Sequence, residues 1–500
     1  MSLFLEFRRG SLLPHIALAI ILVVSLYSCL DDGDGHSKSR SGYQQIANPK
    51  IEFPPEIGEP FLWVANFELA EVGYQEQEFF VSGTSNAFTN LSELGPDGLW
   101  EVEPGEQAHY KTRVVVLRPV NSSDFSGTVF VEWMNVTGNL DRAPIWITGH
   151  TGIIREGHAL VAVSAQYAGI EGAEDTVSPL SLKTINPERY ASLVHPGDSF
   201  SYDIFSQVSE AIRRPQEINI LDGLSVNQIL ATGSARGATR LVTYINAIHP
   251  LYNPYSGYLL RGRLGGGKPL AEDPLVPIDT PEVVTVRTDL NVPVLTLQSE
   301  SDLFVFGFVE DRQEDTEKFR LWEVAGTSHT NSYTAGTGID DIGTDPEFFV
   351  LKEENEGCDR PVNAAPSSWM LNTAISALVS WSLGRQQPPH AERLTLTDDN
   401  LSFLRDEYGN VLGGIRNSYV DAPAATLSGE GQTGAPSCEF RGITSLFNPA
   451  EMASLYVDKS GYIQAVRKAA DEASSKGFLL PPDAQRINQA ASIQWDRLGI

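Results

Sequence analysis

The sequence has few cysteines, few basic residues and only one long hydrophobic run, and each shortage excludes a class of protein. Lys and Arg total 36 against 64 Asp and Glu, and the resulting net charge of −28 disfavours binding to nucleic acid phosphates. The 43 Gly and 30 Pro follow no period, which excludes collagen-like repeats. With 41% hydrophobic and 20% charged residues, the 500-residue chain has the composition of an ordinary globular protein, large enough for one elaborated domain or two.

The long hydrophobic run stands at the N-terminus and predicts an export signal. Arg8 and Arg9 precede an apolar stretch, residues 16–24, that is too short to span a bilayer comfortably. The segment Leu-Tyr-Ser-Cys that ends at Cys29 resembles the lipobox of bacterial lipoproteins. We therefore expect a signal peptide over residues 1–28 and a lipid on Cys29. A plain secretory signal with an incidental cysteine is the alternative.

This signal also predicts where the protein lies. The expected location is the periplasmic or cell-surface side of a bacterial membrane, with the N-terminal lipid as the only membrane contact. Residues 29–50 are polar and rich in Gly and Ser at their start, which predicts a flexible tether.

Two further cysteines, Cys358 and Cys438, remain after the signal. No second Cys or His stands at metal-ligand spacing beside either, so no metal site is expected there. In an oxidising compartment such a pair predicts a disulfide, with two free buried thiols as the alternative.

Apolar strands alternate with helical patterns through the middle of the chain. This alternation predicts an α/β fold with a mostly parallel central sheet and helices on both faces, in one large domain over residues 51–500. Residues 264–290 are too long and Pro-rich for a simple connection and are expected to form a lid or insert. The expected strands and helices are 112–117, 128–134, 159–164, 198–213, 228–232, 238–248, 257–260, 294–298, 320–324 and 368–383.

A glycine-rich segment in this region, residues 262–268, matches the start of a phosphate-binding loop. Pro269 replaces the Ser or Thr that would ligate magnesium, and it has no backbone N–H to donate to a phosphate. Nucleotide binding is therefore not expected.

The strand–turn–helix pattern over residues 229–244 has the form of a nucleophile elbow without its nucleophile. Gly233 and Gly237 stand two residues before and after the centre of the turn, where the strand and helix backbones nearly touch. The residue at the centre, where the elbow needs a serine, is Ala235. A methyl group cannot attack a carbonyl, so this chain should be nearly inert as a serine hydrolase.

Two later strand ends supply an acid and a histidine. Glu300 and Asp302 end one apolar strand, and His329 lies in a small-residue loop after the next. The order 235, 302, 329 is the nucleophile–acid–histidine order of α/β-hydrolases. In that chemistry the histidine takes a proton from the hydroxyl, and the acid holds the ring in the required tautomer. Asp302 is the expected acid, and Glu300 is the alternative.

Another predicted strand leads into the segment Val-Glu-Trp-Met-Asn-Val-Thr-Gly-Asn, residues 131–139. In α/β-hydrolases this loop donates one N–H to the oxyanion, and the residue after the nucleophile donates the other. The candidate donors are the amides of Arg236, Asn135, Val136 and Thr137, although Asn135 also fits a simple turn. The aromatic residues considered for lining a pocket, with core packing as the alternative, are Trp133, Trp146, Tyr167 and Tyr333.

Several segments together resemble a family. The chain is similar, over roughly residues 60–490, to the large bacterial family of secreted, esterase-like proteins called α/β-hydrolase domain proteins. The resemblance implies an α/β-hydrolase fold with C-terminal elaborations, a serine nucleophile and hydrolysis of carboxylic esters. The family's serine maps onto Ala235. The segments that carry the resemblance are VEWMNVTGN, GDSFSYDIFSQ, ATGSARGATRLVTYINAIHP, PVLTLQSESD, WEVAGTSHT, GNVLGGIR, CEFRG and LYVDKSGYIQAV.

Three explanations account for Ala235. It is an engineered inactivation, or it marks a natural pseudohydrolase that binds a ligand in the pocket, or Ser234 acts as the nucleophile one residue early. The expected function is a serine-type carboxylic-ester hydrolase scaffold that takes a small-molecule ester. The alternative is a non-catalytic, ligand-binding lipoprotein. No metal or organic cofactor and no nucleic-acid partner are expected.

Overall fold

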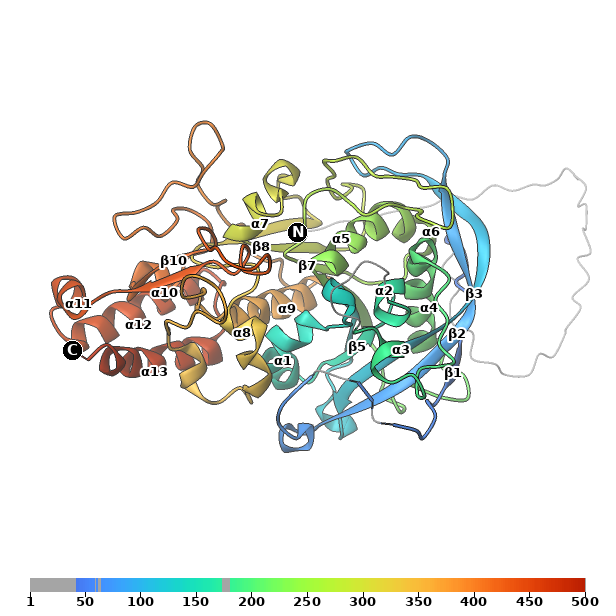
Figure 1. Ribbon diagram of the computed structural model, residues 1–500, viewed down its shortest axis with the longest axis horizontal. Coiled ribbons are helices and arrows are strands. Elements are labelled where there is room, and N and C mark those ends of the chain that lie inside the picture. The colour runs from blue at the N-terminus through green and yellow to red at the C-terminus, as the bar shows by residue number, and fades with distance from the viewer. Residues whose placement is uncertain (1–41, 59, 62–63, 173–179, 500) are drawn as a thin grey trace, which may run out of the picture. The chain divides into compact units, whose positions relative to one another are not determined.

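A nine-stranded sheet runs through the described part of the chain, in the order β1-β2-β3-β5-β4-β6-β7-β8-β9 (Figure 1). Neighbouring strands from β5 to β9 are parallel, while β1, β2 and β3 form an antiparallel edge. The expected mostly parallel sheet is therefore confirmed. Its strands are β1 (Lys50–Glu52), β2 (Tyr74–Asn90), β3 (Val102–Pro119), β4 (Thr128–Trp133), β5 (Ala159–Val163), β6 (Gln228–Ser234), β7 (Tyr258–Arg261), β8 (Val294–Ser299) and β9 (Phe319–Val324).

The computed structural model describes residues 42–58, 60–61, 64–172 and 180–499. The predicted signal peptide (1–28), Cys29 and most of the predicted tether lie outside the described residues. The described end of that tether packs on the domain, since the Gln44 amide donates to Leu251 O over 2.9 Å and Ile46 is buried. The packed chain thus begins before residue 51.

The central strands, β4 to β9, are buried at every position because helices cover both faces of the sheet. All residues of β4 are buried, and their side chains alternate between two hydrophobic clusters. Val129 and Val131 belong to the cluster that includes α4 (Ser201–Arg213) and α5 (Arg236–Thr243). Phe130 belongs to the cluster on the other face.

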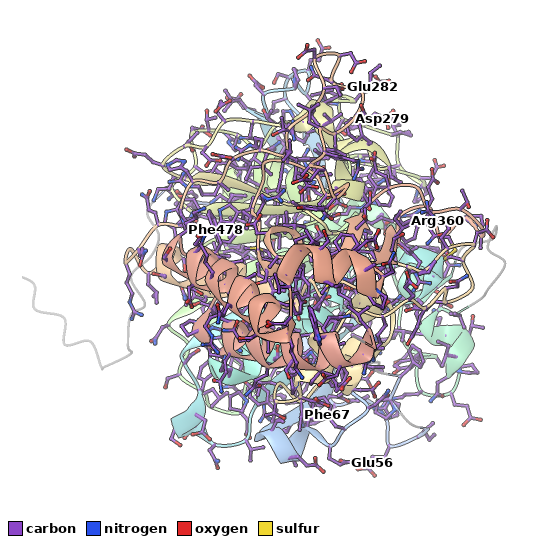
Figure 2. All side chains as sticks on the ribbon, turned by 90° about the vertical axis from the view of Figure 1, so that its left-hand side faces the viewer. Glu56, Phe67, Asp279, Glu282, Arg360 and Phe478 are labelled. Carbon is purple, nitrogen blue, oxygen red and sulfur yellow. A yellow bond between two sulfur atoms is a disulfide. The ribbon has the colours of Figure 1, made fainter. Side chains whose placement is uncertain are left out.

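The second cluster is formed with α1 (Pro144–Arg155), α9 (Ser368–Ser382) and the C-terminal helices α12 (Lys459–Ser475) and α13 (Pro481–Arg497). The C-terminal helices face the viewer in Figure 2, where Phe478 lies in the turn between them and packs on Trp322 of β9. They account for the expected C-terminal elaborations. The remaining α-helices of the described residues are α2 (Tyr167–Ile170), α3 (Leu182–Ile185), α6 (His249–Tyr252), α7 (Glu300–Phe304), α8 (Ser332–Ala335), α10 (Ser418–Asp421) and α11 (Pro449–Tyr456). A small second sheet pairs β10 (Ala425–Ser428) with β11 (Ile443–Leu446).

The predicted insert, residues 264–290, is packed onto the domain. Both carboxylate oxygens of Asp311 accept backbone N–H groups from it, Oδ2 from Gly266 and Oδ1 from Val284. Glu272 of the insert pairs with Arg240 of α5 at 2.8 Å. Asp279 and Glu282 mark the outer part of the insert at the upper edge of Figure 2.

Cys358 and Cys438, which are 80 residues apart in the sequence, form a disulfide with a sulfur–sulfur distance of 2.01 Å. The predicted disulfide is confirmed. Across the described residues, no helix combines the length and the apolar character that a membrane span requires.

Candidate functional site

Residue 235 lies in a sharp turn between β6 and α5 and has a left-handed backbone. Ala235 has φ 51° and ψ −119°, a region that residues with a Cβ rarely adopt. The two flanking glycines are required by close approach of the backbone. A Cβ on Gly237 would lie 2.4 Å from Trp133 O, and a Cβ on Gly233 would lie 2.8 Å from the Gly237 carbonyl carbon. The turn therefore has the strained geometry of a nucleophile elbow, with a methyl group at its centre.

The acid and the histidine predicted from the sequence are in contact. Asp302 Oδ1 lies 2.6 Å from His329 Nδ1. The other oxygen, Oδ2, accepts hydrogen bonds from the Ser299 amide at 2.6 Å and from the Ser299 hydroxyl at 2.7 Å. These bonds cap the N-terminus of α7 and fix the carboxylate, so the ring of His329 is oriented through Nδ1. His329 Nε2 makes no hydrogen bond with any described residue.

Glu300 is fully buried and does not contact His329. Its carboxylate accepts the amides of Gly326, at 2.6 Å, and Gly429, at 2.8 Å. Burial raises the pKa of Glu300 to about 7 despite these two bonds. Of the two candidate acids, Asp302 is the one beside the histidine. Glu300 instead connects the loop of Gly326 with the loop of Gly429 through its two hydrogen bonds.

Arg261, which sequence reasoning missed, links the elbow to the histidine loop. Its carbonyl accepts the Ala235 amide at 3.1 Å, and its guanidinium donates to Ser234 Oγ at 3.0 Å and to His329 O at 3.1 Å. Burial lowers the pKa of Arg261, while the Asp302 and Glu132 carboxylates act in the opposite direction. The next residue, Gly262, has no room for a side chain, because a Cβ there would lie 2.9 Å from His329 Nδ1.

Ser234 is buried in β6 and its hydroxyl is engaged by Arg261, not by His329. Its carbonyl accepts from Asn135 Nδ2 at 3.3 Å. Ser234 thus lacks the contact with a base that a nucleophile needs.

The loop after β4 comes close to the elbow and leaves one candidate amide without a partner among the described residues. The Asn135 amide donates to Arg142 O, and the Thr137 amide donates to the Asn135 side chain. Neither the Val136 amide nor the Arg236 amide makes a hydrogen bond with a described residue. Two of the four predicted oxyanion donors are therefore occupied, and the amides of Val136 and Arg236 remain.

The buried carboxylate of Glu132, at the end of β4, holds the two ends of this loop together. Both oxygens of Glu132 accept amides at the start of α1, from Ile145 at 2.8 Å and Trp146 at 3.2 Å. Burial raises the pKa of Glu132 to about 8. The carboxylate thereby fixes the far end of the loop that carries Val136.

The aromatic residues considered for lining a pocket lie mostly in the core. Trp133, Trp146 and Tyr333 are buried, and Tyr167 is 42% exposed and packs on His195. Trp133 and Trp146 belong to the hydrophobic clusters, which fits the core-packing alternative, and the buried Tyr333 donates its hydroxyl to Asp341 at 2.9 Å.

Two other aromatic rings contact the histidine. The ring centroid of Phe306 lies 4.6 Å from that of His329, and the centroid of Phe440 lies 5.8 Å from it. Sequence reasoning missed both. The position of Phe440 two residues after Cys438 was a signal only once the disulfide was known.

Among the described residues, no group of three or more His, Cys, Asp or Glu side chains could hold a metal ion. The chemistry available to the arrangement is that of an acid–histidine pair, two oriented amides and whatever group stands at residue 235.

A family model described as "Alpha/beta hydrolase domain" matches residues 43–489. A search of curated proteins finds no match.

Solved structures of esterases resemble parts of the chain. A fungal esterase from Rhizomucor miehei is 13% identical, covering 60% of this chain and 85% of its own, with a TM-score of 0.31. Acetyl xylan esterase 1 from Thermoanaerobacterium sp. JW/SL YS485 is 9% identical, covering 55% and 81%, with a TM-score of 0.27. The glucuronoyl esterase from Solibacter usitatus is 8% identical, covering 59% and 87%, with a TM-score of 0.29. At these TM-scores the likeness is partial, and the fold is established by the strand order and the family match.

Proposed function

The chain belongs to the alpha/beta hydrolase domain family, and from this we propose that it is a serine-type carboxylic-ester hydrolase scaffold whose nucleophile is replaced by Ala235. The observation that carries the proposal is the backbone of residue 235, with φ 51° between two glycines that cannot be larger. A strained residue of this kind costs on the order of 1–3 kcal/mol. A turn with this strained backbone is suited to presenting a reactive side chain at residue 235. The methyl group of Ala235 has no such reactivity.

With a serine at position 235, each neighbouring group has a chemical role. The serine hydroxyl attacks the ester carbonyl while His329 Nε2 takes its proton, and Asp302 stabilises the imidazolium that forms. The amides of Arg236 and Val136 donate to the oxyanion. His329 then returns the proton to the leaving alcohol, and water, activated by the same histidine, releases the acyl group as a carboxylic acid.

With Ala235 the same site can still bind an ester but has no nucleophile. In a serine protease, losing the nucleophile costs about 10⁶-fold in turnover. The second candidate function is therefore a ligand-binding pseudohydrolase. The alanine at position 235 favours this second function. The ester-hydrolysis experiment described below decides between the esterase and the pseudohydrolase.

We also propose that the protein is exported and attached to a membrane through Cys29. Two features support this: the sequence that precedes Cys29, and the disulfide between Cys358 and Cys438, which is typical of oxidising compartments. The mass of the mature N-terminus tests it. A lipid-modified Cys29 supports the proposal, and an unmodified or uncleaved N-terminus contradicts it.

The decisive experiment is hydrolysis of a panel of short- and long-chain esters by this chain and by Ala235→Ser. The serine variant should gain at least about 10⁴-fold in kcat/KM, because it restores the group on which the other site residues act. Adding His329→Ala to that variant should remove the gain. If the serine variant hydrolyses no ester while both forms still bind one, the pocket serves binding and the pseudohydrolase interpretation replaces the esterase.

A further inference from the structure

We propose that Phe306 and Phe440 form an aromatic wall on the leaving-group side of the site, and that this wall selects esters whose alcohol part is an aryl group. The inference rests on the proposed function, because it uses the role of His329 in ester cleavage. It goes beyond that function by naming the substrate class and the residues that determine it.

The two rings and the imidazole contact one another in a group of three. The centroids of Phe306 and Phe440 are 5.6 Å apart, and each ring also packs on His329, Phe440 edge-to-face. Both phenylalanines are half-buried, and neither belongs to a hydrophobic cluster of the described residues. Their rings thus pack on each other and on the histidine, and part of their apolar surface stays accessible to solvent.

The position of the wall beside His329 assigns it to the alcohol part of an ester. The histidine must deliver its proton to the oxygen of the leaving alcohol, so that oxygen lies within hydrogen-bond reach of Nε2. Groups that flank the imidazole therefore flank the alcohol part. The acyl part lies instead toward the elbow and the amides that bind the oxyanion.

The backbone on each side of the wall is fixed. The Gly265 amide donates to Phe306 O at 2.9 Å, and the Thr330 amide donates to Phe440 O at 3.3 Å. The disulfide at Cys438 holds the turn that carries Phe440, and the Arg441 carbonyl accepts the Asn363 amide at 3.0 Å. A binding surface whose backbone is already ordered loses little entropy when a ligand binds.

An aryl group suits this wall better than an alkyl group. Aromatic pairs prefer tilted and edge-to-face arrangements with centroids about 4.5–7 Å apart, and they gain stability beyond that of the area they bury. A flat ring placed against Phe306 and Phe440 extends the group of rings already present. A saturated chain of equal area gains the burial alone.

The first test uses the chain as it exists, because Ala235 allows intact esters to be titrated. Phenyl propanoate and methyl phenylacetate are isomers that carry the ring on the alcohol side and on the acyl side respectively. Calorimetric titration should show about tenfold tighter binding of phenyl propanoate. Phe440→Ala should remove that preference, while Phe447→Ala, a half-buried phenylalanine that packs on Tyr408, should keep it. Equal binding of the two isomers, or no binding of either, overturns the proposal.

A second measurement guards against variants that fold poorly and against a purely supporting role of the rings. Phe440→Leu and Phe306→Leu remove the rings but keep an apolar side chain, and they are combined with Ala235→Ser. The wall predicts a loss of about tenfold in kcat/KM for phenyl propanoate, mainly through KM, and less than about twofold for its isomer. An equal fall in kcat for both esters would mean that the rings only position His329, and the wall would be refuted. Because the titration needs no turnover, an inactive Ala235→Ser variant contradicts the proposed function without deciding the wall.

Discussion

The elbow and the histidine side of the site are held in place by different means. The elbow joins a strand and a helix of the core, and every residue of β6 from Gln228 to Ser234 is buried. The histidine lies in loops, and those loops are joined by the disulfide, by the Glu300 carboxylate and by Asn363 Nδ2, which donates to Gly326 O at 3.0 Å. Regular secondary structure thus positions residue 235, whereas side chains and a covalent link position His329.

This difference explains how an alanine can occupy the elbow without changing it. The turn depends on backbone contacts and on two glycines, and none of these involves the side chain of residue 235. The histidine side has the opposite character, because individual side chains make its contacts. We therefore expect side-chain changes to damage the histidine side, and only changes that add a Cβ to damage the elbow.

The largest expected effect separates the two carboxylates of the histidine side. In the Ala235→Ser background, Asp302→Asn should lower kcat by about 10⁴-fold, because the amide favours the wrong tautomer of His329. Glu300→Gln should lower it by less than about tenfold, since Glu300 does not touch the ring. Steady-state hydrolysis of one aryl ester measures both, and comparable losses in the two variants would contradict the assignment of Asp302.

Removing the covalent link should come next. Replacing both cysteines, Cys358→Ser with Cys438→Ser, should lower the free energy of unfolding by about 4 kcal/mol, because the disulfide closes a long loop in the unfolded chain. Denaturant unfolding measures the loss. A decrease below about 1 kcal/mol would show that the loops of the histidine side hold without the bond.

A methyl group added to the elbow should destabilise it slightly less. Gly237→Ala places a Cβ 2.4 Å from Trp133 O, so strand and helix must separate, at a cost of about 3 kcal/mol. Gly336→Ala is the matched control, because nothing lies within 4 Å of the added atom. Equal changes in the melting temperatures of the two variants would mean that the elbow can accommodate a Cβ at residue 237, which would contradict the requirement for glycine there.

The smallest effect concerns pH. Burial raises the pKa of Glu300 from its usual 4.5 to about 7, so its contribution to stability is complete below pH 4.5 and is lost as the pH rises through 7. Glu300→Gln cannot titrate. Between about pH 5 and pH 8, the melting temperature of the parent should therefore fall by roughly 2–5 °C more than that of the variant. Parallel curves would mean that this carboxyl is already ionised in the folded protein at the lower pH.

The sequence predicted the parts of the molecule that are built from regular secondary structure better than the parts that are held by side-chain contacts. The strands β4 to β9 were expected within about two residues, because each is an apolar run bounded by turns. β2 was missed, since polar residues, among them Glu76, Gln77 and Glu78, leave it no apolar run longer than three residues. Much of β3 was missed for a similar reason, because its first half is polar and exposed.

For the site, Gly233, Gly237, Asp302 and His329 could be found because each lies at the C-terminal end of a strand or within about five residues after it, where the fold brings strand ends together. Arg261, Phe306 and Phe440 could not be found. Their importance lies in contacts between segments far apart in the sequence, and local pattern carries no information on those.

The length of chain between the elbow and Phe440 has a consequence for biosynthesis. At ribosomal speeds of 5–20 residues per second, roughly 10–40 s separate the synthesis of residue 235 from that of residue 440. Strands β4 and β6 pair with each other, and both precede the histidine loop in the chain. A chain that emerges from the ribosome N-terminus first therefore contains the parts of the elbow before it contains His329 or its aromatic neighbours. The site becomes whole only when residue 440 has emerged, 205 residues after the elbow.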